Sequence, residues 1–197
     1  MCVRKLACWT GVVAVVIAWL VIGASWYLNR NWFVFTRDAF SDLGGKRSCC
    51  PGLYNYGLVL TGLVIIAYSL CLYYLAKSKP EVLGAGYVGL AGVFLGLIGV
   101  FPEGTRPHVF VSSWFFVQMD LGLMFQSIGL YIRSRRWEGF WGAILSLLAF
   151  PVAILIELTV GWPSAAVLEA YGVLVIDAIV LLLSKGYMSE AKGICGP

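Results

Sequence analysis

Apolar residues in this chain occur in six long blocks separated by short polar stretches. A helix of about 20 apolar residues spans the hydrocarbon core of a bilayer, and backbone groups in lipid must be hydrogen-bonded within the protein. The blocks are too long and too continuous for barrel strands, so each predicts a membrane-spanning helix. The six blocks are 6–28, 53–76, 83–101, 111–132, 140–159 and 166–184.

Composition agrees with this pattern. Of the 197 residues, 60% are hydrophobic and 12% are charged, whereas a soluble domain carries about a quarter charged residues. The net charge of +4 is spread over short loops and does not predict nucleic-acid binding. We therefore expect an all-α, polytopic protein of the cell membrane, with residues 1–197 forming one six-helix bundle. The first block is longer than a signal-peptide core and predicts a retained anchor.

Lysine and arginine predict the orientation of the bundle. Nine of them fall on the side of the two termini and five on the opposite side, so the positive-inside rule places both termini in the cytoplasm. Connections 29–52 and 103–110 then lie together outside. The nine are Arg4, Lys5, Lys77, Lys79, Arg133, Arg135, Arg136, Lys185 and Lys192, and the five are Arg30, Arg37, Lys46, Arg47 and Arg106.

Small residues and one proline predict how the helices pack. Gly89, Gly92, Gly96 and Gly99 recur at spacings of three and four, which places them on one face of the third helix. Such a face lets another helix backbone approach closely in lipid. Pro151 lies inside the fifth helix, where its ring displaces a backbone hydrogen bond and predicts a kink.

The six cysteines do not predict a disulfide framework. Cys49 and Cys50 are adjacent and external, and a vicinal disulfide needs a strained backbone, so two free thiols or a partner elsewhere are expected. No CxxC or Cys/His pair indicates zinc, a single histidine excludes a bis-imidazole haem, and no nucleotide motif is present. The other four thiols are expected to stay reduced in the cytoplasm or in helices. They are Cys2, Cys8, Cys71 and Cys195.

The first outer connection, 29–52, is long and mixes aromatic with charged residues. Loops of this length are often lids or binding elements. Its aromatic side chains are interpreted as an interfacial belt at the headgroup level. They are Trp32, Phe33, Phe35 and Phe40.

Placing a carboxylate within a membrane helix costs free energy, so each such residue indicates a function or a specific partner. Ser113, Asp120 and Ser127 repeat every seven residues and predict a polar stripe facing the bundle interior. Two interpretations stay open: an outward-opening cavity whose acids bind a cation, a proton or a headgroup, or neutral acids that hydrogen-bond across helices as structural links. The acids in the predicted helices are Asp120, Glu157, Glu169 and Asp177.

Short motifs gather on the outer face. Ser-Asp-Leu-Gly at 41–44 precedes the second helix, Asn-Tyr-Gly at 55–57 lies in its first turns, and Gly-Val-Phe-Pro-Glu at 99–103 ends the third helix shortly before His108. This order resembles an archaeal and bacterial family of polytopic membrane proteins catalogued as domain of unknown function number 998. The resemblance covers most of the chain and implies a six-span bundle, with no established activity.

The Ser-Asp-Leu-Gly segment is also similar to the Ser-Asp-x-Gly segment of the eukaryotic FRAG/DRAM/Sfk-type membrane proteins. Those proteins are linked to lipid and membrane homeostasis. The chain lacks the several histidines of the ceramidase-like membrane hydrolases, which argues against a zinc mechanism of their kind.

The outer residues support more than one chemistry. Asp42, Glu103 and His108 have the donor types of a site for a divalent metal ion. They also suit an acid–base set in which a carboxylate orients His108 and Ser41 is the nucleophile.

A purely structural interpretation competes with both chemistries. Ser41 or Asp42 caps a short helix that ends at glycine, Glu103 pairs with Arg106, and His108 begins the fourth helix.

Three function classes follow. We expect binding or processing of a membrane lipid or small amphiphile at an outward-facing site; the alternatives are an ion- or proton-coupled transporter or channel and a non-catalytic accessory subunit. Against transport, no inverted repeat or pair of broken helices is present. The transport pathway would use Asp120, Glu157, Glu169 and Asp177. The candidate catalytic residues are Ser41, Asp42, Glu103 and His108, and the substrate-binding candidates are Arg37, Arg106, Asn55 and Asp120.

Overall fold

The computed structural model describes residues 3–195, with side chains placed for 9–189, and all regular elements in this part of the chain are helices. The expected positions of Arg4, Lys5, Lys192 and the thiols of Cys2, Cys8 and Cys195 lie outside the described side chains. The helices are α1 (Val3–Leu28), the short 3-10 helix η1 (Phe40–Gly44), α2 (Pro51–Leu75), α3 (Lys79–Val100), α4 (His108–Ser134), α5 (Trp137–Thr159) and α6 (Ala165–Cys195).

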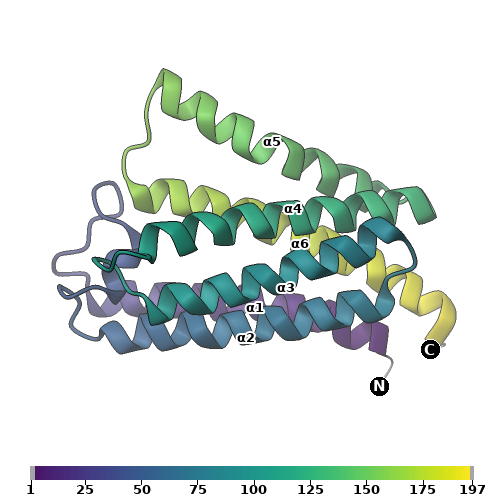
Figure 1. Ribbon diagram of the computed structural model, residues 1–197, viewed down its shortest axis with the longest axis horizontal. Coiled ribbons are helices and arrows are strands. Elements are labelled where there is room, and N and C mark those ends of the chain that lie inside the picture. Colours follow the sequence, from purple (N-terminus) through teal and green to yellow (C-terminus); the bar gives the residue numbers. More distant parts are fainter. Residues whose placement is uncertain (1–2, 196–197) are drawn as a thin grey trace.

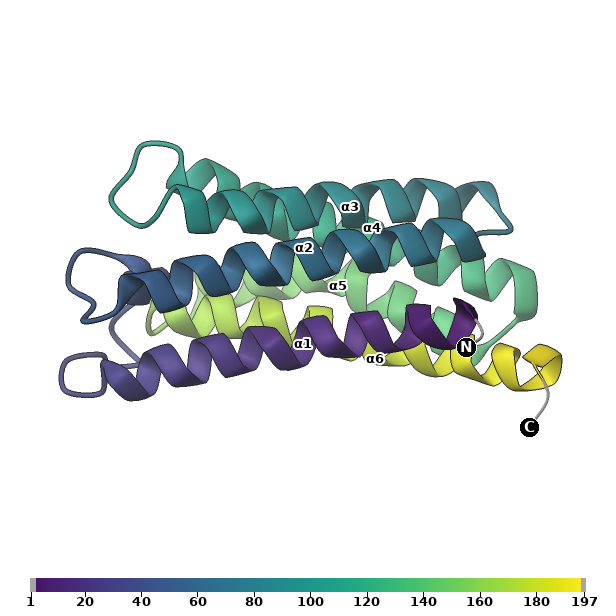
Figure 2. The same ribbon diagram turned by 90° about the horizontal axis from the view of Figure 1, so that it is seen from below.

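The six α-helices run side by side and alternate in direction (Figures 1 and 2). All six are long and apolar enough to cross a membrane, so the predicted six-helix bundle is confirmed. One end, which we call the His108 end, carries connections 29–50, 101–107 and 160–164. The opposite end, which we call the terminal end, carries both termini and connections 76–78 and 135–136.

The predicted blocks match the helices, but several ends differ. Helix α3 begins four residues earlier than predicted, because Ser78 accepts a hydrogen bond from Glu81 N and Glu81 in turn accepts one from the Ser78 hydroxyl. This reciprocal capping is a recognised helix start. Helix α4 begins at His108, three residues before the predicted start.

Glycine contacts hold α2, α3 and α4 together, as the stripe on α3 predicts. A side chain at Gly62 of α2 would meet the carbonyl of Gly92 at 2.5 Å, and one at Gly99 would overlap the carbonyl of Asn55. Gly84, also on α3, faces the carbonyl of Gly122 of α4 in the same way. Backbone therefore packs against backbone on both sides of α3.

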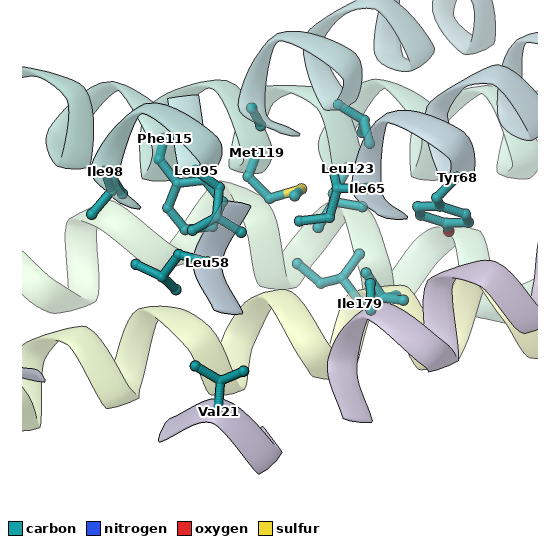
Figure 3. Packing of buried hydrophobic residues seen from close by; sticks show 14 of the residues in the cluster. Val21, Leu58, Ile65, Tyr68, Leu95, Ile98, Phe115, Met119, Leu123 and Ile179 are labelled. Carbon is teal, nitrogen blue, oxygen red and sulfur yellow. The ribbon is translucent and has the colours of Figure 1, made fainter. Parts of the chain in front are cut away.

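The apolar core lies between α1, α2, α3, α4 and α6 (Figure 3). Leu58 and Ile65 of α2 lie near Leu95 of α3, Phe115 of α4 and Ile179 of α6 in that view. All these side chains are buried.

Helix α5 is joined to this core over half its length only. Its buried residues all lie before position 147, and no residue from 147 to 160 is buried. Figure 1 shows the same difference: α5 lies against α4 at the terminal end and diverges from it toward the His108 end. The helix is continuous through Pro151.

Candidate functional site

Connection 29–50 folds onto the bundle around the side chain of Asn29. Its amide nitrogen donates to Ser25 O and Ser48 Oγ, at 2.8 and 3.1 Å. Its oxygen accepts from Cys49 N and from the indole of Trp32. One buried amide thus fixes both ends of the connection.

The aromatic belt prediction is wrong for two of the four residues in this connection. Phe33 and Phe40 are buried, and their rings stack with centroids 6.3 Å apart. Only Phe35 is exposed, and Trp32 is half-buried beneath the guanidinium of Arg47. The connection packs inward because η1 inserts Phe40 and Leu43 between the helix ends.

Helix η1 is held by side chains that the sequence had suggested for chemistry. The Asp42 carboxylate accepts a hydrogen bond from Ala39 N at 2.8 Å and caps η1. The amide of Asn55 donates to Gly44 O at 3.0 Å, and a side chain at Gly44 would overlap the Asn55 amide oxygen. Asn55 therefore attaches η1 to α2, and the structural interpretation holds for Asp42 and Asn55.

His108 is 5% exposed and lies at the start of α4. Its Nδ1 is 2.8 Å from the carbonyl of Phe101, and its Nε2 is 3.1 Å from the carboxylate of Glu103. A carbonyl only accepts, so Nδ1 is the donor in its hydrogen bond with Phe101. Nε2 faces the carboxylate of Glu103, whose side chain is 41% exposed at the bundle surface.

A narrow cavity of about 100 Å³ opens beneath η1 and extends into the bundle. Its wall on α1 extends from Gly11 to Ile22, a distance of about 16 Å along a helix. Most of the wall is apolar, contributed by α1, α2, α3, α4 and α6. The polar lining residues are Ser41, Tyr54, Thr61, Tyr68, His108, Ser112, Glu169 and Asp177.

The cavity contains two carboxylates from α6. Glu169 lies near its mouth and accepts a hydrogen bond from Phe40 N at 2.7 Å, and Asp177 lies deeper and accepts one from the Trp19 indole at 2.6 Å. Asp42 and Glu103 are close enough to act electrostatically on Glu169. The described lining residues include no lysine or arginine.

The two arginines predicted to bind a substrate lie away from the cavity. Arg37 is exposed, pairs with Asp38 at 2.8 Å and donates to Trp32 O. The side-chain hydrogen bond from Arg37 holds the pKa of Asp38 below its ordinary value. Arg106 is exposed and has no ion pair within residues 9–189; Glu103 pairs with His108 in its place. Neither guanidinium lines the cavity.

The metal candidates are only partly brought together. Glu103 and His108 are paired, but Asp42 is turned toward the backbone of η1. Among the side chains that the structure describes, no group of three or more histidine, cysteine, aspartate or glutamate residues can hold a metal ion.

The polar stripe on α4 is only partly internal. Ser127 is buried and Asp120 is half-buried, but Ser113 is exposed, so the prediction is wrong for Ser113. Asp120 does not line the cavity; it approaches Ser146 of α5 and Tyr171 of α6. It lies twelve residues from the start of α4.

The remaining acid and the external thiols lie away from the cavity. Glu157 is exposed and accepts a hydrogen bond from Trp162 N. Cys49 and Cys50 are free and exposed, as one of the two sequence-based alternatives has it.

Sequence reasoning missed two polar contacts within the bundle. The indole of Trp19 donates a hydrogen bond to Asp177. Tryptophan normally lies at the membrane interfaces, so a tryptophan in the middle of the first apolar block could have suggested this contact. At the terminal end Glu81 is fully buried and bonded to Arg133, and Gln126 links it to Tyr187. The signal for the second is the capping pair that begins α3.

Comparisons with known proteins identify one family. The family whose model matches is described as "Protein of unknown function (DUF998)", and the match covers residues 12–185. No curated protein matches the chain, and no solved structure matches it.

Proposed function

The chain belongs to the DUF998 family of proteins of unknown function, and from its cavity we propose that it binds a membrane lipid or small amphiphile with a hydrogen-bond-donating or cationic headgroup. The apolar tail occupies the narrow part of the cavity. The headgroup lies beneath η1, beside Glu169 and His108. The observation that carries this proposal is one elongated, mostly apolar cavity lined by the carboxylates of Glu169 and Asp177, with no lysine or arginine among its described lining residues.

The dimensions of the cavity favour a single chain over a whole phospholipid. About 100 Å³ is comparable to engineered apolar cavities that take up a benzene-sized molecule. A wall of about 16 Å is close to the depth of one leaflet of hydrocarbon, about 15 Å. A slender segment of one tail matches both quantities, and the rest of the ligand lies outside the cavity.

The carboxylates near the mouth of the cavity favour a headgroup that donates hydrogen bonds or carries a positive charge. Glu169 has one hydrogen bond from backbone, and two further acids lie near it. A carboxylate accepts hydrogen bonds and does not donate them when ionised. An ammonium or hydroxyl headgroup therefore complements this mouth, whereas a carboxylate or phosphate would be repelled by it.

The side of the membrane follows from the basic residues. Nine of the fourteen lysines and arginines belong to the terminal end and the segments next to it, so the positive-inside rule orients the His108 end outward. Under this orientation the mouth of the cavity opens toward the outer leaflet of the cell membrane.

The test fills the cavity and measures binding of dodecylamine, with dodecanoate as the anionic comparison, to protein in phosphatidylcholine nanodiscs. Ala14 is 7% exposed and lines the cavity, so Ala14→Phe should remove saturable dodecylamine binding. Val16 of the same helix is 50% exposed, and Val16→Phe should leave binding unchanged. Dodecanoate should bind at least about tenfold more weakly to the unchanged protein.

Equal binding by the two phenylalanine variants would overturn the proposal, because dodecylamine would then be held by the bilayer or the protein surface. Ala18→Leu is a milder change in the same wall and should weaken binding if Ala14→Phe does not fold.

Cation-coupled transport is a second candidate, favoured by the position of Asp177. This acid is 8% exposed, lies well inside α6 and has an indole N–H as its hydrogen-bond donor. If the protein is a cation-coupled transporter, Asp177→Asn should abolish the cation uptake into proteoliposomes that a pH gradient drives. Under amphiphile binding alone, the same variant should still bind dodecylamine through Glu169.

A further inference from the structure

The two carboxylates of the cavity lie at different depths along one helix. Glu169 and Asp177 both belong to α6, and both line the cavity. Asp177 follows Glu169 by eight residues, a separation of about 12 Å along a helix. Glu169 accepts its hydrogen bond from Phe40 of η1 at the mouth, whereas Asp177 accepts its own from Trp19, within α1. The cavity therefore has one acid at its mouth and a second acid deeper inside.

Each of these carboxylates has one oxygen atom that can still accept a hydrogen bond. The N–H of Phe40 bonds to Oε2 of Glu169, and the indole of Trp19 bonds to Oδ2 of Asp177. No donor within residues 9–189 bonds to the other oxygen of either acid. A carboxylate accepts at both of its oxygens, so Oε1 of Glu169 and Oδ1 of Asp177 are available to a ligand.

Two buried hydroxyl groups at the mouth also lack partners. Ser41 of η1 and Tyr54 of α2 line the cavity and are 7% and 6% exposed. Neither hydroxyl forms a hydrogen bond within residues 9–189, although buried polar groups normally have one. Ser41 follows Phe40, whose N–H bonds to Glu169, and a side chain at Gly44 would meet the ring of Tyr54 at 2.9 Å. The mouth thus combines a carboxylate with two hydroxyls that have no partner in the described part of the chain.

The other lining residues do not compensate the charges of the two acids. Among the described residues of the lining, only His108 can carry a positive charge, and its ring nitrogens already face Phe101 O and the carboxylate of Glu103. An ionised carboxylate without a partner is costly within a membrane helix, and Asp177 is 8% exposed. A ligand with two positive charges would compensate both acids.

From this arrangement we propose that the ligand of the cavity is a linear diamine, with one ammonium at Glu169 and the other at Asp177. This inference rests on the proposed function, because it takes a cationic amphiphile as the occupant of the cavity. The outer ammonium has three donors, which suit the Glu169 carboxylate and the hydroxyls of Ser41 and Tyr54. The inner ammonium donates to Asp177, and the methylene spacer lies against the apolar wall. Hydrogen bonds between ionised groups are stronger than neutral ones.

The separation of the two acids sets the length of the spacer. An extended chain advances by at most about 3.6 Å for every three bonds. The nitrogens of 1,8-diaminooctane are then about 11 Å apart, whereas those of 1,4-diaminobutane are about 6 Å apart. Only the longer diamine matches the separation of about 12 Å between Glu169 and Asp177 along α6.

The test measures binding by calorimetry to the full chain in phosphatidylcholine nanodiscs, with empty nanodiscs as the blank. The unchanged protein should bind 1,8-diaminooctane at least about tenfold more tightly than octylamine, which has the same carbon chain and a single amine. It should also bind 1,8-diaminooctane at least about tenfold more tightly than 1,4-diaminobutane, which has both charges but cannot reach both acids.

Two changes at Asp177 assign the second amine to this acid. Asp177→Asn keeps an oxygen to accept the hydrogen bond from the Trp19 indole but removes the charge. It should lower the affinity for 1,8-diaminooctane to that for octylamine, whose own affinity should not change. Asp177→Glu keeps the charge and should keep the preference for the diamine. If neither variant folds, the comparison of the three ligands on the unchanged protein still tests the inference.

Two results would overturn the inference: affinity for 1,8-diaminooctane no higher than for octylamine or 1,4-diaminobutane, or a preference for the diamine that persists in Asp177→Asn. If dodecylamine still binds and Ala14→Phe removes that binding, only the diamine inference fails and the amphiphile proposal stands. If neither dodecylamine nor 1,8-diaminooctane binds, both fail.

Discussion

The two ends of the bundle treat buried acids in opposite ways. At the terminal end, Glu81 is fully buried and lies 3.1 Å from the guanidinium of Arg133, and Glu138 lies 3.0 Å from that of Arg136. Toward the His108 end, Glu169 accepts a hydrogen bond from backbone and has no ion pair among the described residues.

This difference suggests different roles for the two ends, one in stabilising the fold and one in the proposed binding. A buried acid that is paired with a cation stabilises the fold, because breaking such a pair is strongly destabilising. An acid without a cationic partner has a negative charge that no other side chain compensates, and a bound ligand or a proton can compensate it. We therefore assign the terminal end to holding the fold and the His108 end to binding.

The largest expected effect is at the terminal end. Arg133→Ala leaves Glu81 buried without its cation, so the free energy of unfolding should fall by about 3 kcal/mol or more. Thermal unfolding in detergent measures the change. Lys79→Ala, at an exposed position of the same end, is the control and should have little effect.

If Arg133→Ala lowered the free energy of unfolding no more than Lys79→Ala does, the distinction between the two ends would fail. The pair with Glu81 would then contribute no more to stability than an exposed ion pair does. Glu81→Gln extends the comparison: it keeps the shape of the side chain but loses the charge that faces Arg133.

An intermediate effect is expected from the same isosteric change at the His108 end. Glu169→Gln keeps an oxygen to accept the hydrogen bond from Phe40 N, so stability should change by less than about 1 kcal/mol. Dodecylamine binding should weaken about tenfold or more, since a hydrogen bond to a charged group is lost. Measurement of both quantities on one preparation separates them.

A destabilised Glu169→Gln protein with normal binding would reverse the assignment of this acid. It would place Glu169 with Glu81 among the residues that hold helices together.

The smallest effect is expected at an exposed pair. Arg37 lowers the pKa of Asp38, so the pair contributes stability above the ordinary aspartate pKa and loses it as pH falls through the lowered value. Arg37→Ala should therefore be slightly less stable than the unchanged protein at neutral pH. The difference should begin to shrink below about pH 4 and should vanish once the pH is below the lowered pKa of Asp38.

Unfolding temperatures measured from neutral to acidic pH check this sign. A difference between the two proteins that grows on acidification would show that another group controls the titration of this loop.

Much of the candidate site was predictable from short stretches of sequence. Pro102 ends an apolar run, and only four residues lie between Glu103 and His108, so one short loop brings the two together. The prediction of Glu103 with Arg106 was wrong because His108 is buried beside the carboxylate, whereas Arg106 extends into solvent.

Other parts were not predictable because their partners are remote along the chain. Phe40 N and Glu169 are 129 residues apart, and Trp19 and Asp177 are 158 apart. Local periodicity places each of these residues on a helix or in a loop, but it does not say which helix faces which. The cavity exists only once those contacts form.

The sequence by itself determined the six membrane-spanning helices and the placement of both termini at one end. Long apolar runs enter the bilayer, and there the backbone groups must be hydrogen-bonded within the segment, so each run forms a helix. The tertiary structure decided which acids are paired and which line the cavity. That choice depends on helix–helix contacts between distant residues, and such contacts arise from side-chain shape and packing across the whole bundle.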